Sequence, residues 1–363
     1  MRLCHFSPNY YSTGSIVGGG EKYPLYLIRS LERAAIAAFD HSIVSLGASD
    51  ARVVVDGGRV VDVIGRDGEN GFEADRLIER IDDADIVIVY QCFTPIGLFV
   101  ASHAKLRGKK VVGLDMGGGE HPFVFQSPEA CSMYDFFVAY SKFCADGMRA
   151  FGPPVLTILG PVDTDYYELD AAPRDERLLL MIGRILPHKG HEQLIRSLAE
   201  GDRCIIAGNV YDADYERFLR GLIKLSRAEV EIRTGASDRC VKALIQRASL
   251  FVHPSRSVDH RGARHSKPEL LGLAPLEAMA CGTPALVSCA GALEELGELA
   301  GCTTFADEGE LQRLLRRVRM GELKFPAPSA IRAAVVERYG LEQFGEKLAR
   351  ALTRPIEDMR CAS

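Results

Sequence analysis

The chain has 363 residues, of which 47% are hydrophobic and 26% charged, a balance typical of two globular domains. Its net charge of −5 is uneven, because residues 1–165 hold 15 Lys and Arg against 21 Asp and Glu. This acidic half repels nucleic acid and anionic membranes, so we expect no nucleic-acid partner.

Two further features indicate a cytoplasmic protein. The N-terminus MRLCHFSPNY lacks the apolar core of a secretory signal, and no apolar stretch approaches the ~18 residues of a membrane-spanning helix. The ten cysteines form no C-x-x-C pair, as is typical of free thiols in a reducing compartment. We therefore expect no stable membrane insertion.

Strand and helix patterns alternate along the chain, which predicts an α/β protein built from βαβ units around parallel sheets. The first half predicts a hairpin of residues 53–55 and 60–63, helices at 21–39 and 142–150, and strands at 2–6, 41–46, 86–90, 111–114, 136–139 and 155–159. A polar linker is expected at 160–174. Beyond it, strands are expected at 178–182, 204–207, 230–233, 249–252 and 285–288, and an amphipathic helix at 341–353.

The stretch PELLGLAPLEAMACGTPALVS, residues 268–288, is the most informative. Pro275 suits the first position of a helix and Gly282 the position just past its end. Glu269 then lies in the preceding loop and Glu277 in the first turn. The backbone N–H groups of the residues between the two glutamates form an anion site at the helix N-terminus; these residues are Leu270, Leu271 and Gly272.

Two acidic side chains beside a phosphate site suit a sugar–diphosphate–nucleoside, because one can accept hydrogen bonds from sugar hydroxyls and the other from ribose hydroxyls. The alternative is that Glu277 only interacts with the helix dipole and Glu269 is a solvated loop charge.

Cationic residues follow the expected strand 178–182 within MIGRILPHKGHEQLIRSL, residues 181–198. Ligands of open α/β sheets bind at the carboxyl ends of strands, so Arg184 and Lys189 are placed to hold a diphosphate. Either residue alone is equally compatible with a solvated loop cation.

A glycine turn in VGGGEKYPLYLIRSL, residues 17–31, opens the first helix. Its backbone at Gly18 and Gly19 allows close approach of an anion, although a turn that serves packing alone explains it equally well. The glycines lack the G-x-G-x-x-G spacing of a dinucleotide site, which disfavours an NAD-dependent dehydrogenase.

Together these stretches resemble the retaining glycosyltransferases of family 4, which have the GT-B fold. That family's signature runs G-G-x-E, then G-R-x-x-x-x-K-G, then E-x7-E followed by A-M-A-x-G-x-P. The matching residues here begin at Gly18, Gly183 and Glu269. The resemblance implies two facing Rossmann-like domains with an interdomain cleft: an acceptor domain at 1–165, a donor domain at 166–335, and a C-terminal helix within 336–363 that packs on the first domain.

The resemblance also implies roles for single residues. Arg184 and Lys189 would neutralise the leaving diphosphate, Glu269 would contact the donor sugar, and Glu277 the ribose. Backbone at residues 270–272 and at Gly18 and Gly19 would hold phosphate, and the loops at Gly208 and at Thr234 to Ala236 would hold the base. No metal and no cofactor are expected, and Asp163-Thr164-Asp165 is interpreted as linker sequence, not a D-x-D metal motif.

The chain departs from the family at LDMGGGEHPF, where many relatives have T-D-H-G-G-G. Met116 occupies the place of the histidine that contacts the donor sugar. His121 lies nearby but is shifted, so it is either a substrate contact or a structural loop residue.

The predicted function is transfer of a hexose or N-acetylhexosamine from a UDP- or GDP-type nucleotide sugar to a small soluble acceptor. The acidic segment 62–85 favours a neutral or cationic acceptor. The sequence leaves open whether the protein forms a homodimer. The alternatives are an epimerase or phosphorylase on the same fold, or a non-catalytic nucleotide-sugar-binding subunit. The basic loop at residues 256–267 is either a mobile lid over the phosphates or a solvated loop.

Overall fold

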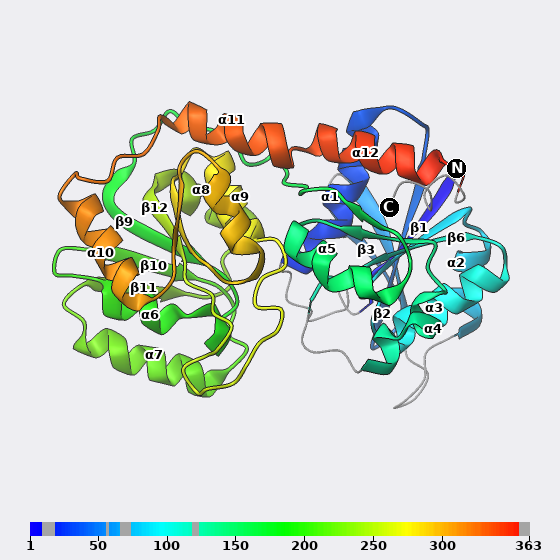
Figure 1. Ribbon diagram of the computed structural model, residues 1–363, viewed down its shortest axis with the longest axis horizontal. Helices are drawn as coiled ribbons and strands as arrows, with labels where there is room; N and C mark the ends of the chain where they lie inside the picture. Colours follow the sequence, from blue (N-terminus) through cyan, green and yellow to red (C-terminus); the bar gives the residue numbers. More distant parts are fainter. Residues whose placement is uncertain (9–18, 56–57, 66–73, 118–122, 356–363) are drawn as a thin grey trace. The chain divides into compact units, whose positions relative to one another are not determined.

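The computed structural model describes residues 1–8, 19–55, 58–65, 74–117 and 123–355, which form two compact units (Figure 1). Unit 1 comprises Met1–Pro161 together with Leu341–Ser363, and unit 2 comprises Val162–Gly340. The chain thus leaves unit 1 after Pro161 and returns to it at Leu341, a few residues from the boundaries expected at 165 and 335.

Unit 1 is built on a sheet of order β3-β4-β2-β1-β5-β6-β7-β8, in which only the β3–β4 pair is antiparallel. Its strands are β1 (Arg2–Phe6), β2 (Asp40–Gly47), β3 (Ala51–Val55), β4 (Arg59–Gly65), β5 (Ile86–Tyr90), β6 (Lys110–Leu114), β7 (Phe136–Ala139) and β8 (Val155–Thr157). Its helices are α1 (Gly19–Ala34), α2 (Ala74–Asp82), α3 (Pro95–Leu106), α4 (Pro128–Cys131), α5 (Lys142–Met148) and α12 (Leu341–Thr353).

The C-terminal helix α12 lies beside α1, although more than 300 residues separate them in sequence (Figure 1). The close approach depends on Gly345, because a Cβ there would lie 1.8 Å from the carbonyl oxygen of Ser30. Leu348 and Phe344 of α12 are fully buried in this contact region. The packing therefore fixes the end of the described chain on unit 1.

Unit 2 is built on a fully parallel sheet of order β11-β10-β9-β12-β13-β14. Its strands are β9 (Asp175–Ile182), β10 (Arg203–Ala207), β11 (Glu229–Arg233), β12 (Ala248–His253), β13 (Ala285–Ser288) and β14 (Cys302–Phe305). Its helices are α6 (His191–Ser197), α7 (Ala213–Leu225), α8 (Asp238–Arg247), α9 (Leu273–Ala280), α10 (Glu308–Arg319) and α11 (Pro328–Tyr339).

Helices cover both faces of the sheet of unit 2, with α6, α7 and α10 on one face and α8, α9 and α11 on the other (Figure 1). The core of the first face joins alternate strand residues such as Met181 and Ile206 to Leu194, Leu219 and Leu314 of the helices. This period of two is what a strand buried on both faces requires. The predicted α/β architecture of two Rossmann-like units is confirmed.

Two expectations need correction. The polar linker expected at 160–174 is exposed at residues 168–173, but its first part packs on unit 2: Val162, Asp163 and Tyr167 are buried, and Arg332 of α11 donates hydrogen bonds to the carbonyl oxygens of Thr164 and Tyr167. In addition, α9 begins at Leu273, so Pro275 is its third residue and not its first. Because the first N–H groups of a helix lack intrahelical partners, proline is tolerated there as well.

Candidate functional site

The candidate site lies where the strand order of unit 2 reverses. The chain proceeds from β9 to β10 on one side and later adds β12 on the other side of β9. Ligands of open α/β sheets bind at the carboxyl ends of strands at such a switch point. Lys189 follows β9 in a 3-10 turn, Pro187–Lys189, and Ser255 and Glu269 follow β12.

Three side chains converge on one oxygen of Glu269. The Lys189 Nζ atom donates to Oε1, as do His253 Nε2 at 2.7 Å and Ser255 Oγ at 2.9 Å. The Lys189 and Glu269 side chains are only 10% and 12% exposed. Lys189 and Glu269, which were predicted to contact different parts of the donor, thus form a nearly buried ion pair.

The electrostatics keep Glu269 ionised. Burial acts to raise its pKa, but the charges and hydrogen bonds of Lys189 and His253 outweigh burial and hold that pKa well below the ordinary value. The carboxylate is therefore a hydrogen-bond acceptor, which makes His253 Nε2 the protonated ring nitrogen. An ionised carboxylate suits the binding of hydroxyl groups, because it accepts their hydrogen bonds.

The backbone of Glu269 is also fixed. The N–H of Ala292 donates to the carbonyl oxygen of Glu269 at 3.0 Å. Gly291 makes this possible, because its φ is +60° and a Cβ there would lie 2.3 Å from the same oxygen. The loop after β13 therefore holds the loop of Glu269 by direct backbone contact.

The residues between the two glutamates form the start of α9. Leu270 and Leu271 are buried, and Gly272 precedes the helix with a φ of +82°. Glu277 is the fifth helical residue, so its expected position in the first turn was wrong. Glu277 is buried beside Tyr167, where burial and the nearby Glu277 charge raise the pKa of the tyrosine. The phenol therefore stays protonated.

Arg184 does not join the Lys189–Glu269 pair in this structure. Its side chain is exposed, and its guanidinium lies 5.4 Å from the centre of the Tyr211 ring. It remains at the carboxyl end of β9, on the same edge of the sheet as Lys189.

The expected base-binding loops lie at the carboxyl ends of β10 and β11. Gly208 is in close contact with the strand-end loop of Arg184, because a Cβ on Gly208 would lie 1.8 Å from the carbonyl oxygen of Gly183. Thr234 is exposed and Ala236 is half-buried. Between them, the N–H of Gly235 donates to the side chain of Asn209 at 3.2 Å, which joins the two loops.

Part of the predicted site lies in unit 1 or outside the described residues. Gly18 and His121 are outside them. Gly19 is the first residue of α1, and Met116 is half-buried after β6.

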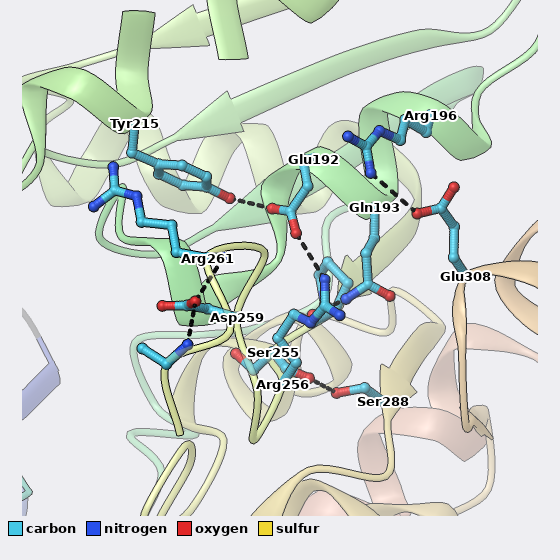
Figure 2. Close-up of polar contacts among 12 residues, drawn as sticks. Glu192, Gln193, Arg196, Tyr215, Ser255, Arg256, Asp259, Arg261, Ser288 and Glu308 are labelled. Atoms are coloured by element: carbon cyan, nitrogen blue, oxygen red, sulfur yellow. Dashed lines mark hydrogen bonds and ion pairs between the residues drawn. The ribbon is translucent and has the colours of Figure 1, made fainter. Parts of the chain in front are cut away.

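The basic loop at residues 256–267 forms ion pairs with other segments of unit 2. Figure 2 shows the buried Glu192 carboxylate between the hydroxyl of Tyr215 and Arg256, whose Nη1 donates at 2.9 Å. Arg261 makes two hydrogen bonds to Asp212, at 2.6 and 3.2 Å. Two of the loop's basic side chains, Arg256 and Arg261, therefore have acidic partners in unit 2, and the lid stays a hypothesis.

Sequence reasoning missed His253, Ser255 and Glu192. The signal that could have found the first two is position, because they stand at the carboxyl end of a strand expected at 249–252. Glu192 gave no such signal, since its partners Tyr215 and Arg256 are distant in sequence.

In the described ranges, His, Cys, Asp and Glu side chains form no group of three or more that could hold a metal ion. None of the helices in those ranges combines the length and apolar character needed to cross a bilayer.

The fold is that of GT-B glycosyltransferases, as solved structures of low sequence identity show. The Anabaena protein HepE in complex with UDP and glucose superposes with a TM-score of 0.71 at 17% identity, covering 97% of this chain and 99% of that chain. Sucrose-phosphate synthase from Thermosynechococcus elongatus gives 0.73 at 15%, covering 100% of both. AviGT4, a glycosyltransferase involved in avilamycin A biosynthesis, gives 0.69 at 18%, covering 98% of both.

A sequence family also matches the part of the chain that contains the site. The family model "Glycosyl transferases group 1" matches residues 168–319, which lie within unit 2 and include Arg184, Lys189, Glu269 and Glu277. Over these residues unit 2 is therefore similar to the glycosyl transferases group 1 family. A search of curated protein sequences found no match.

Proposed function

We propose that the protein is a retaining glycosyltransferase that moves a hexose or N-acetylhexosamine from a UDP- or GDP-type nucleotide sugar to a hydroxyl group of a small soluble acceptor. The observation that carries the proposal is the buried Lys189–Glu269 pair at the switch point of a domain similar to the glycosyl transferases group 1 family. The complex of HepE with UDP and glucose supports the choice of donor, at the level of the shared fold.

The proposed chemistry has one bond broken and one formed. The bond between the sugar C1 and the β-phosphate oxygen breaks, and its electron pair stays on the phosphate. The acceptor oxygen attacks C1 from the same face and gives its proton to a leaving phosphate oxygen. Negative charge grows on the diphosphate during this step, so stabilisation of that charge is the main contribution that the protein can make.

We assign this stabilisation to Lys189 and Arg184 and to the backbone N–H groups at residues 270–272, which precede α9. Glu269 accepts hydrogen bonds from the donor sugar, and Glu277 from the ribose. The proposal needs no metal, because cationic side chains and a helix N-terminus supply positive charge to the diphosphate.

For the acceptor we propose a small neutral or cationic molecule that binds unit 1. The support is the excess of acidic residues in positions 1–165, which disfavours an anionic lipid surface. Three acidic side chains of the segment 62–85 already have arginine partners: Asp62, Asp82 and Asp85. The proposal therefore rests on the charge of the unit as a whole.

The test is a transfer assay with UDP- and GDP-sugars, a panel of small acceptors including amino sugars and amino cyclitols, and EDTA in half of the samples. We expect a new glycoside that retains the anomeric configuration of the donor and forms equally with EDTA. Consumption of the nucleotide sugar without acceptor would indicate an epimerase. Binding without turnover would indicate a non-catalytic subunit, and activity only on a lipid-linked acceptor with strong binding to anionic liposomes would contradict the acceptor proposal.

A further inference from the structure

The carboxylate of Glu269 is held asymmetrically. All three hydrogen bonds that it accepts in the described structure end on Oε1, from Lys189, His253 and Ser255. A carboxylate offers about four acceptor positions over its two oxygens. Three donors saturate Oε1, so any further donor, such as a hydroxyl group of a ligand, has to bind Oε2.

His253 differs from the other two donors in its surroundings. His253 is the last residue of β12 and is only 3% exposed. The other ring nitrogen, Nδ1, is buried and has no hydrogen-bond partner in the described structure. The bond from Nε2 to Glu269 is thus the one hydrogen bond of this ring in the described structure. The ring lies 6.1 Å from the Phe251 ring.

The cost of this arrangement points to a role. A buried nitrogen without a partner is unfavourable, whereas an apolar side chain at the end of a buried strand would avoid that penalty. The histidine therefore has to be explained by the hydrogen bond that it does make. The Lys189 side chain is flexible, so its bond alone would let the Glu269 carboxylate change orientation. His253 stands at a fixed strand end, and its bond to Glu269 therefore restricts that carboxylate.

We propose that His253 is a positioning residue, which with Ser255 fixes the Glu269 carboxylate in one orientation and leaves Oε2 for the donor sugar. This inference rests on the proposed function, since it assigns Glu269 to the sugar. His253 itself does not touch the donor. It acts through Glu269, so its loss affects the recognition of the sugar and not the binding of the nucleotide.

A second consequence concerns the ionisation of Glu269. Burial raises the pKa of this group, and Lys189 and then His253 lower it. The other titratable groups around the pair are His188, in the same turn as Lys189, and His191 of α6, which interacts with His253. Removal of the His253 hydrogen bond therefore raises the pKa of Glu269, and the acid limb of the pH profile should move to higher pH.

The test compares His253→Leu with His253→Gln, whose side-chain amide can still donate a hydrogen bond. The matched control is His103→Leu in unit 1, because His103 Nε2 also bonds to a carboxylate, at 3.1 Å from Asp82. For His253→Leu we expect kcat/KM for the nucleotide sugar to fall by about 10- to 100-fold, the size of one hydrogen bond to a charged group. The Kd of the bare nucleoside diphosphate should stay within about twofold.

We further expect His253→Gln to recover at least half of the loss on a logarithmic scale and His103→Leu to behave like the wild type. Unchanged kcat/KM and an unchanged acid limb in His253→Leu would overturn the inference. So would an equal loss of affinity for the bare nucleotide, without recovery in His253→Gln, because that result indicates a structural role. A wild type that binds no nucleotide sugar would overturn the proposed function as well, which separates the two failures.

Discussion

The two sheets reverse their strand order at corresponding places but carry different chemistry there. In unit 2 the reversal lies between β9 and β12, and Lys189 and Glu269 form a nearly buried ion pair beside it. In unit 1 the reversal lies between β1 and β5, and the described residues that follow these strands include Ser7 and Gln91, which are uncharged. Shared topology thus provides a binding position, and the side chains decide what binds.

The contrast fits the division of labour that we propose. A leaving diphosphate gains negative charge and needs cationic partners, whereas an acceptor hydroxyl group needs orientation more than compensating charge. Substitutions at the charged switch point should therefore change catalysis strongly. Those at the uncharged one should act weakly and on the acceptor alone.

The largest effect is expected from Lys189→Met. Loss of one group that stabilises the growing charge should lower kcat by about 10²–10³, and we expect the same of Arg184→Ala, because the proposal assigns Arg184 to the diphosphate as well. Lys242→Met is the control, because Lys242 forms an ion pair with Glu168 at 2.9 Å elsewhere in unit 2. Near-normal turnover in Lys189→Met, with the fold verified by circular dichroism, would contradict the comparison.

The next largest effect is expected on the free energy of unfolding, where substitutions of two arginines in the loop 256–267 should differ. Arg256→Met leaves the fully buried Glu192 with Tyr215 as its remaining partner. Breaking a buried pair costs about 3–5 kcal/mol, and because Arg256 is 34% exposed we expect about 2–3 kcal/mol in chemical denaturation. Arg261→Met removes an exposed pair with Asp212 and should leave the transition unchanged. Equal shifts in both variants would show that burial of Glu192 does not matter.

The two glutamates of the site should differ in the ligand that they affect. Glu277→Gln should weaken binding of the bare nucleoside diphosphate by about 10-fold, because it contacts the ribose in the proposal. Glu269→Gln should leave that binding intact and reduce discrimination between donor sugars. Calorimetry with both ligands and both variants measures this, and equal losses throughout would refute the assignment.

Buried histidines predict a pH dependence of stability that both units share. Burial is the main cause that lowers the pKa of His41 in unit 1 to about 4 and the pKa of His191 in unit 2 to about 3. Because the unfolded state then binds more protons, stability is complete above about pH 6.5 and falls as the pH drops towards 3–4. Each residue contributes a slope of up to about 1.4 kcal/mol per pH unit.

The measurement is the free energy of unfolding from pH 7 to pH 4 for the wild type, His191→Phe and His41→Phe. Each variant should show a shallower dependence on pH than the wild type. Parallel curves for all three proteins would show that these histidines do not take up the protons.

The sequence predicts most strands of both sheets, including the edge strands β3, β8 and β11, but misses the edge strand β14 and helix α11. The strands at 2–6, 86–90, 136–139 and 285–288 coincide with β1, β5, β7 and β13, because buried apolar runs mark them. The edge strand β14 has the polar sequence CTTF, and α11 lies in a region that suggested no separate helix. Burial of these elements comes from packing between segments distant in sequence, which single-sequence patterns do not contain.

The candidate site divides in the same way. Glu269, Glu277 and Lys189 were predicted from their spacing in the chain, and the structure pairs Lys189 with Glu269. His253 and Ser255 reach the same oxygen only because β12 ends beside β9. The pairing of Glu192 with Arg256 spans 64 residues and involves a loop that the sequence suggested to be mobile or solvated.

The smallest effect is expected at the switch point of unit 1. Gln91 has a φ of +61° directly after β5, and Ala35, at the end of α1, has a φ of +49°. Such a conformation costs a residue other than glycine on the order of 1 kcal/mol, so glycine should fit both positions without loss of stability. Strain of this kind is retained at functional sites, whereas a helix end uses it only for capping.

We therefore expect Gln91→Gly to raise the KM of the acceptor a few-fold without changing the Kd of the donor, and Ala35→Gly to change neither. Identical acceptor kinetics in the two variants would remove Gln91 from the acceptor site and leave unit 1 without a catalytic contribution from this strand end.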